Sequence, residues 1–213
     1  MILYHFSNSP FARRVRLVLA HKGLSAELRD PRTHPERLPE VQALSPMHTV
    51  PVLVDGERTI PDSTAIVHYL ERKHPEPAVF PQGQGGALAF ELAALADSAI
   101  GVLADLGLRY YALHGDPSFP KVREDMVGRA QRSLSRIASL VLARGNGVPL
   151  CGESWGWADI VVYTTVTWLE GLPVRAVTLP LPRQIVSLGW TLPPELSEWA
   201  DQHRARPDAI AVG

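Results

Sequence analysis

Cysteine is almost absent from this chain of 213 residues, in which Cys151 is the only one. No disulfide can therefore form within the chain. Charge of one sign is lacking too, because 21 Lys and Arg residues face 22 Asp and Glu residues, for a formal net charge of −1. This balance gives no indication of binding to nucleic acid or to an anionic membrane surface.

Long apolar runs, targeting signals and metal-binding motifs are also missing. No apolar run approaches the ~18 residues of a transmembrane helix. The N-terminal "MILYHF" has neither a basic stretch ahead of it nor a cleavage site, so we expect no signal peptide. The eight histidines follow no HExxH or paired Cys/His spacing, so no metal site is expected. These absences predict a cytoplasmic protein without membrane association.

Short strands alternate with helices over the first 73 residues. Phe11, Val15 and Val18 recur at helical spacing, and Gly23 suits the end of that helix. The clearest hairpin is "PVLVDGERTIP", with its turn at Asp55-Gly56. Asp62 or Ser63 then caps another helix. The pattern predicts βαβαββα, with elements at residues 2–6, 10–22, 25–30, 35–43, 51–61 and 62–73.

The composition changes at residues 75–86, "PEPAVFPQGQGG", where three prolines and three glycines indicate a linker. Beyond this point the strand signals fade. Long helices are expected over residues 87–114 and 121–144, followed by another in "GWADIVVYTTVTWL" and shorter pieces that end at "PPELSEWADQHRAR". An α/β domain thus precedes an all-helical domain.

Four segments together resemble the cytosolic glutathione S-transferases: "SPFARRVRLVLAHKG", "SPMHTVPVLVDGE", "PDSTAIVHYLERKHP" and "GWADIVVY". The resemblance is to serine-type, bacterial-like members, and the motifs are most similar to those of the zeta-, theta- and omega-like branches. The resemblance implies a thioredoxin-like glutathione-binding domain over residues 1–78 and an all-α bundle over residues 87–213. It also implies a homodimer.

The resemblance places glutathione along the chain at Val50 and Pro51. In this family the Val-Pro bond is cis, and the backbone of Val50 pairs with the cysteinyl residue as an added strand would. Asp62 and Ser63, at a helix start, would hold the γ-glutamyl ammonium and carboxylate. Thr49 stands where many relatives carry Lys or Gln, so His48 or an arginine is a candidate for the glycyl carboxylate.

Ser9 precedes the first helix, at the position of the catalytic residue in the family's cysteine and serine branches. Its hydroxyl could donate to the glutathione sulfur and favour the thiolate. The same serine could serve only as a helix cap. Ser7, Asn8 and Tyr4 are rivals, although Tyr4 falls within a strand. The domain containing Ser9 has no cysteine, so thiol–disulfide exchange is not expected.

The helical domain of this family supplies an apolar pocket for the second substrate. The candidates for that pocket are Phe11, Tyr110, Tyr111 and Trp168. Asp159 in "GWADIVVY" is expected to cap a helix that begins at Gly156, as a folding residue. The arginines at positions 13, 14 and 16 are expected to form a solvated helix face, from which one member could reach glutathione or a dimer partner.

The predicted function is conjugation of the glutathione thiolate to a small apolar electrophile, with glutathione as co-substrate and no metal. One alternative is glutathione-dependent isomerisation, as in the maleylacetoacetate isomerases. Their Ser-Ser-Cys motif is not intact here, because only its first serine has a counterpart, Ser9. Another alternative is a non-catalytic binding or regulatory protein of the same fold.

Overall fold

The computed structural model describes residues 1–81, 83–145 and 147–212, apart from the side chains of residues 84 and 211. Its contacts divide the chain into two compact units. The first unit comprises Met1–Phe80 with Arg204–Gly213, and the second comprises Pro81–His203. The sequence analysis assigned residues 204–213 to the helical domain. They group with the first unit because α10 (Pro207–Ala211) contacts the first helix of the chain.

The first unit has the expected order βαβαββα. Its strands are β1 (Ile2–Tyr4), β2 (Glu27–Arg29), β3 (Val52–Asp55) and β4 (Arg58–Pro61). Its helices before residue 80 are α1 (Pro10–His21), the 3₁₀ turn η1 (Pro35–Arg37), α2 (Leu38–Leu44) and α3 (Ser63–Lys73). The strands form one mixed sheet in the order β2-β1-β3-β4, in which β1 pairs parallel with β2 and antiparallel with β3.

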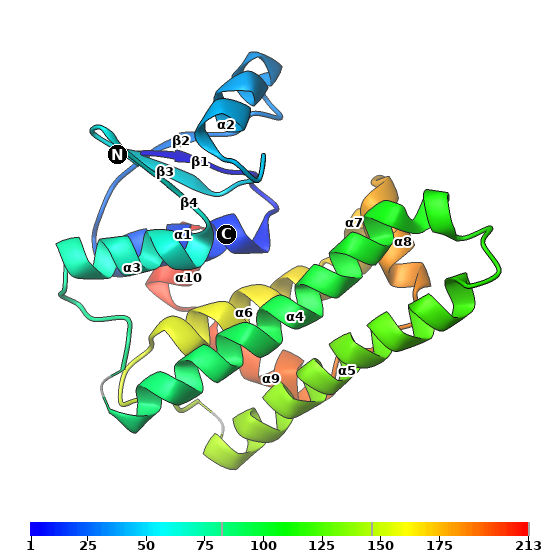
Figure 1. Cartoon of the computed structure of the whole chain (residues 1–213). Coiled ribbons are helices and arrows are strands. Elements are labelled where there is room, and N and C mark those ends of the chain that lie inside the picture. The colour runs from blue at the N-terminus through cyan, green and yellow to red at the C-terminus, as the bar shows by residue number, and fades with distance from the viewer. Residues whose placement is uncertain (82, 146, 213) are drawn as a thin grey trace. The chain divides into compact units, whose positions relative to one another are not determined.

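Helices cover both faces of this sheet (Figure 1). Alternation along the strands sends neighbouring side chains to opposite faces. Tyr4 and Val52 pack with Val41 of α2 on one face. Leu3 and Leu53, which are register partners and fully buried, face the other way. Helices α1 and α3 contact each other and cover that second face, which brings the start of each helix to the same sheet.

The β3–β4 hairpin differs by one residue from the expected turn. Asp55 pairs with Arg58, so the two turn residues are Gly56 and Glu57 rather than Asp55 and Gly56. Gly56 has a φ of 61°, a left-handed conformation that glycine adopts without steric cost. The resulting register places Val52 opposite Pro61. The residues just before β3 and just after β4 therefore lie side by side.

The second unit is helical over its described residues. Its helices are α4 (Gln84–Leu113), α5 (Phe119–Arg144), α6 (Trp157–Glu170), α7 (Leu172–Arg175), α8 (Pro180–Ser187) and α9 (Pro194–His203). Gly156 is the N-cap of α6, and its N–H donates to Asp159 Oδ2 at 3.0 Å. The other oxygen of Asp159 accepts from the N–H of Leu150 at 2.9 Å. Asp159 is thus the folding residue that the sequence predicted.

Helix α4 corrects one expectation from the sequence. Over Gly85–Leu113 it is long and apolar enough to cross a membrane, judged by length and composition alone. Within the second unit α4 contacts α5, α6 and α8, and its row Leu92, Ala96, Ile100 and Leu103 is buried. The core helix of a soluble protein can have the same length and composition, although only 39% of the most apolar window of α4 is buried.

Candidate functional site

Ser9 lies at the N-cap of α1, with Pro10 in the first helical position. Its Oγ accepts a hydrogen bond from the N–H of Ala12 at 3.3 Å. A hydroxyl that accepts in this way keeps its own proton for a second partner. Capping and donation to a ligand are therefore compatible at Ser9, which is half-buried at the mouth of the helix.

Ser7 and Asn8, the rival donors, are held by Arg32. Arg32 donates from Nη1 to Asn8 Oδ1 at 2.6 Å and from Nη2 to Ser7 Oγ at 3.0 Å. Its guanidinium also lies 4.5 Å from the centre of the Phe6 ring. The sequence analysis missed Arg32, because no local pattern indicates that the loop after β2 returns to the start of α1.

Asp30 completes this network. It accepts from the N–H of Ser7 at 3.1 Å and pairs with Arg32 at 3.0 Å. Burial acts to raise the pKa of Asp30, but the hydrogen bonds from Arg32 and from the Ser7 backbone outweigh it and hold the pKa at about 2. The loop that presents Ser9 is therefore fixed by an ionised carboxylate and a guanidinium.

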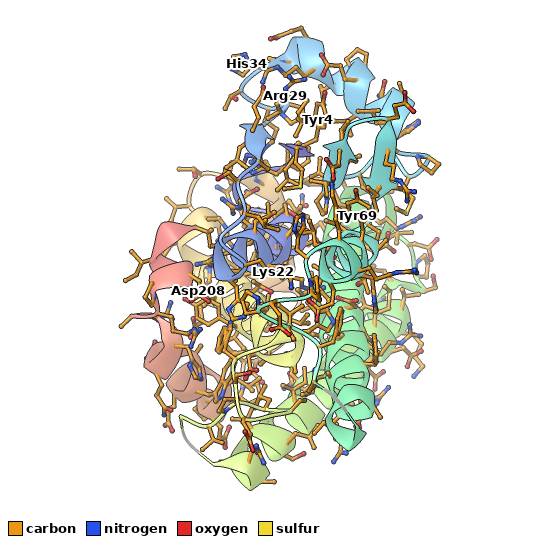
Figure 2. All side chains as sticks on the ribbon, turned by 90° about the vertical axis from the view of Figure 1, so that its left-hand side faces the viewer. Tyr4, Lys22, Arg29, His34, Tyr69 and Asp208 are labelled. Atoms are coloured by element: carbon orange, nitrogen blue, oxygen red, sulfur yellow. The ribbon has the colours of Figure 1, made fainter. Side chains whose placement is uncertain are left out.

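Tyr4 is turned away from this loop. Its side chain is buried on the α2 face of the sheet, as expected. Its hydroxyl donates to Glu40 Oε2 at 2.5 Å and accepts from Arg29 Nη1 at 3.1 Å. Figure 2 shows Tyr4 and Arg29 beside each other. Burial and the hydrogen bond to Glu40 raise the pKa of Tyr4. The Tyr4 hydroxyl is therefore already engaged in hydrogen bonds within the first unit.

The peptide bond between Val50 and Pro51 is cis, as the resemblance predicted. Among the described residues, neither the N–H nor the C=O of Val50 has a hydrogen-bond partner. The C=O of Pro51 accepts from the N–H of Asp62 at 3.3 Å. This bond ties the segment before β3 to the start of α3 and leaves the Val50 backbone as an unpaired edge.

Asp62 and Ser63 form the start of α3. Asp62 is the N-cap, and its Oδ1 accepts from the N–H groups of Thr64 and Ala65 at 2.9 and 3.1 Å. Its φ of 77° is unusual for a residue other than glycine. Ser63 is 2% exposed. In the described part of the chain, Asp62 Oδ2 and the N–H of Ser63 have no hydrogen-bond partner.

His48 and Thr49 lie in the loop before Val50, and both are exposed. His48 adopts a φ of 53°, and its N–H donates to Ser45 O at 2.9 Å. The loop brings both residues to the same edge as Val50. Their contact with a glycyl carboxylate stays a prediction.

The candidates for the second-substrate pocket have separate surroundings. In the first unit, the guanidinium of Arg14 lies 4.8 Å from the Phe11 ring centre. In the second unit, Tyr110 stacks on His114 at 5.1 Å, and Tyr111 is 70% exposed. Trp168 has the guanidinium of Arg175 at 5.9 Å from its ring. Their role in substrate binding stays a prediction.

The expectation of a solvated arginine face on α1 is wrong. Arg14 is fully buried, and Arg13 and Arg16 are half-buried. Arg13 and Arg16 line a small pocket together with Ser9. Helical spacing showed that these arginines alternate with apolar residues, but it did not show which neighbours cover them. No group of three or more His, Cys, Asp or Glu side chains suited to a metal occurs among the described residues.

Residues 3–78 match the family described as "Glutathione S-transferase, N-terminal domain". Among curated proteins, the chain is 42% identical over 114 residues to Glutathione S-transferase 1 of Dianthus caryophyllus, covering 52% of each chain. It is 36% identical over 113 residues to a zeta-class glutathione S-transferase of Euphorbia esula, covering 50% of this chain and 48% of that protein.

A third curated relative is the probable maleylacetoacetate isomerase of Vibrio cholerae, 34% identical over 110 residues, which are 50% of this chain and 49% of that protein. The chain thus spans about half the length of these relatives. Among solved structures, it is similar to a glutathione S-transferase of Methylobacterium radiotolerans in complex with glutathione sulfonate. That similarity has a TM-score of 0.74 at 26% identity and covers 99% of this chain and 92% of the other.

Proposed function

We propose, since this chain belongs to the glutathione S-transferase family and is related to its zeta class, that the first unit binds glutathione and activates its thiol at Ser9. The activated thiolate then attacks an electrophilic carbon of a small, largely apolar compound. The enzyme acts as a cytoplasmic homodimer in this proposal.

One observation carries the proposal: the edge of the first unit presents unsatisfied polar groups that match the parts of glutathione. The unpaired backbone of Val50 suits the cysteinyl residue, as an added strand would. The N–H of Ser63 and the dipole of α3 suit the γ-glutamyl carboxylate. Asp62 Oδ2 suits the γ-glutamyl ammonium through a charge-assisted hydrogen bond.

Ser9 supplies the chemical step in this proposal. A free thiol has a pKa near ~8.5, so it is mostly protonated at neutral pH. The Ser9 hydroxyl can donate to the sulfur, and the N-terminus of α1 favours negative charge there. Both effects raise the thiolate fraction, and binding brings the sulfur and the electrophile together. Cys151 is no rival nucleophile, because burial first, then the Asp159 charge, raises its pKa to about 12.

Proton release during binding tests this function directly. Glutathione is titrated into the protein by calorimetry at neutral pH, in two buffers with different enthalpies of ionisation. We expect the heats to differ, because binding expels the thiol proton into the buffer. S-methylglutathione has no thiol proton, so its heats should agree between the two buffers. Equal heats for both ligands would contradict thiol activation, and absence of any binding would contradict the glutathione site.

Isomerisation is the second candidate, and the similarity to the Vibrio cholerae isomerase favours it. A thiolate that adds to a conjugated cis double bond turns it into a single bond, which can rotate. Elimination then restores the double bond as trans and releases the thiolate. Pro10 and Phe11 stand where the Ser-Ser-Cys motif of the maleylacetoacetate isomerases continues. Conjugation therefore remains the first proposal.

Counting free thiol separates the two reactions. With a conjugated cis-enone, conjugation consumes one glutathione for each product molecule formed. Isomerisation leaves the thiol concentration constant while the trans isomer accumulates. We expect the concentration of free thiol to fall. A constant thiol concentration during turnover would instead indicate an isomerase. A protein that binds glutathione-agarose but turns over neither halides nor enones would be a binding protein.

A further inference from the structure

A tight turn at residues 6–9 connects β1 with α1 and ends at Ser9. The N–H of Ser9 donates to the C=O of Phe6 at 3.0 Å, and this hydrogen bond closes the turn. The C=O of Ser9 accepts from the N–H of Arg13 at 3.0 Å, which is the first hydrogen bond of α1. The backbone of Ser9 is therefore fixed by the turn on one side and by the helix on the other. A change in the turn would move the hydroxyl that we propose as the thiol's partner.

The two central residues of this turn, Ser7 and Asn8, are held by polar contacts. Both are exposed polar residues, so they bury little apolar surface that could keep the turn in one conformation. Arg32 donates from Nη2 to Ser7 Oγ at 3.0 Å and from Nη1 to Asn8 Oδ1 at 2.6 Å. Its guanidinium also lies 4.5 Å from the centre of the Phe6 ring. One side chain thus contacts three of the four residues of the turn.

Arg32 is itself anchored at the end of β2. Its Nε donates to Asp30 Oδ1 at 3.3 Å, and its Nη2 donates to Asp30 Oδ2 at 3.0 Å. The backbone N–H of Arg32 donates to the same Oδ1 at 2.9 Å. Asp30 directly follows β2, which pairs with β1 in the sheet, and its Oδ2 also accepts from the N–H of Ser7 at 3.1 Å. The planar guanidinium therefore joins the turn to the sheet in a fixed geometry.

Arg29 has the same local pattern, but its side chain serves another part of the unit. Its Nε and Nη2 donate to the two carboxylate oxygens of Glu27 at 2.7 and 3.2 Å, as those of Arg32 do to Asp30. Its Nη1, however, donates to the Tyr4 hydroxyl at 3.1 Å, on the α2 face of the sheet. Pairing with a carboxylate two residues earlier is thus common to both arginines, whereas the contact with the turn distinguishes Arg32.

We propose that Arg32 is a positioning residue: by holding the turn at residues 6–9, it directs the Ser9 hydroxyl toward the sulfur of bound glutathione. This inference rests on the proposed function, and it adds a residue that acts through Ser9 rather than on the reacting atoms. A hydroxyl stabilises a thiolate only while its hydrogen points at the sulfur. The contribution of Arg32 is therefore the geometry of its fork, whose Nη1 and Nη2 meet two acceptors of the turn at once.

Arg32→Lys separates this geometry from the positive charge. Lysine keeps the charge but lacks the planar fork. We expect Arg32→Lys to lower kcat about 10-fold at neutral pH, because a displaced donor acts poorly, and to raise the pKa of the bound thiol, measured by thiolate absorbance. The KM for glutathione should change little, since its proposed anchors lie elsewhere. Arg29→Lys is the matched control and should leave kcat and the thiol pKa unchanged. Wild-type kcat and thiol pKa in Arg32→Lys would overturn the inference.

A double-mutant cycle tests whether Arg32 acts through Ser9. In a protein that carries Ser9→Ala, the turn has no hydroxyl left to position. Arg32→Lys should therefore lower kcat no further in that background, although it lowers kcat in the wild type. An equal fold-loss in both backgrounds would overturn the inference, because Arg32 would then act on something other than the Ser9 hydroxyl.

Hydrogen exchange of the glutathione-free protein separates this inference from the proposed reaction. Arg32→Lys should speed exchange of the Ser9 amide, which closes the turn, by about 10-fold or more, the scale of a lost charged hydrogen bond. Amides inside α3 should keep their rates, which distinguishes local opening of the turn from a loss of global stability. An unchanged rate at Ser9 would overturn the inference. If the turn opens in Arg32→Lys but Ser9→Ala keeps the wild-type kcat and thiol pKa, the proposed function fails at Ser9, and the hold of Arg32 on the turn stands.

Discussion

The hydroxyl of Ser9 has two roles, and experiments can distinguish them. It caps α1 by accepting from the N–H of Ala12, and in our proposal it donates to the thiolate. Loss of the cap lowers the stability of the folded protein at every pH. Loss of the donor changes only the ionisation of bound glutathione, so its effect depends on pH.

We therefore expect Ser9→Ala to raise the pKa of bound glutathione and to reduce turnover about 10–100-fold at neutral pH. The loss should shrink as the pH rises, because the thiol then ionises unaided. Ser9→Thr, which keeps a hydroxyl, should retain most of the activity. Profiles of kcat/KM against pH test this, with thermal melts to correct for the folded fraction. Superimposable profiles, with stability lower by about 1 kcal/mol, would reduce Ser9 to a cap.

Asp62 also has two roles, and its two oxygens divide them. Oδ1 caps α3, whereas Oδ2 is assigned to the γ-glutamyl ammonium. Asp62→Asn keeps a capping oxygen and removes the charge. It should weaken glutathione binding by about 1.5–3 kcal/mol, the scale of a hydrogen bond to a charged group, with little change in stability. N-acetylglutathione lacks the ammonium, so the wild type and the variant should bind it alike; a difference as large as that for glutathione would remove Asp62 from the ammonium site.

At the scale of elements, a buried ion pair fixes the end of α1 to α3. The side chain of Lys22 is fully buried, and its Nζ lies 2.6 Å from Glu71 Oε2. The same Nζ donates to the C=O groups of His74 and Pro77 at 2.8 and 2.7 Å. Glu71 in turn accepts from the N–H of Val79 at 3.0 Å. Figure 2 shows Lys22 against this segment of the first unit.

Lys22→Met should destabilise the protein by about 3–5 kcal/mol, because it leaves the carboxylate of Glu71 and two carbonyl groups without their charged donor. Lys73→Met is the matched control. Lys73 also pairs with a carboxylate, that of Asp55, but its side chain is 45% exposed, so the loss of stability should be much smaller than for Lys22→Met. Urea unfolding of both variants measures the difference. Equal losses would show that burial does not strengthen the Lys22 pair.

The Asp30–Arg32 network predicts a sensitivity to acid. The pKa of Asp30 is about 2 in the folded protein, below its ordinary value of 3.8. Folding is therefore favoured by the ionised carboxylate at neutral pH, and this contribution is lost as the pH falls from about 4 to 2. Asp30→Asn should lower the melting temperature at pH 6 and flatten its fall below pH 4. Glu57→Gln, in the exposed hairpin turn, should follow the wild type; an Asp30→Asn curve parallel to the wild type would contradict the assignment.

The elements themselves were largely predictable, because their signals are local. Apolar spacing marked α1, Asp55-Gly56 marked the hairpin within one residue, and Asp62 marked the start of α3. The missed features join residues far apart in the chain. Arg32 donates hydrogen bonds to Ser7 and Asn8. A contact between side chains so far apart in the sequence produces no periodic pattern from which it could be predicted. The burial of Arg14 was hidden for the same reason.

At the scale of the whole molecule, the first unit is built from two segments of the sequence that are separated by the whole of the second unit. The resemblance predicted a first domain that ends near residue 78 and a second that continues to the C-terminus. The linker position agrees with the break after Phe80, but Arg204–Gly213 group with the first unit. His21 of α1 and Asp208 of α10 lie 3.7 Å apart, and Ala209 is 3% exposed. A change in composition marks the end of a domain along the sequence, but it does not show that a later segment packs against that domain again.

Because residues 204–213 belong to the first unit, this unit cannot be completed during synthesis on the ribosome until the second unit has been translated. When Phe80 emerges, the surface of α1 that α10 contacts is still uncovered, and residues 81–203 must be translated before its partner exists. At about 5–20 residues per second this interval is roughly 6–25 s. Throughout that time this surface of α1 stays open to other partners, chaperones included. The helical unit, although it comes later in the message, is the first for which every segment is available.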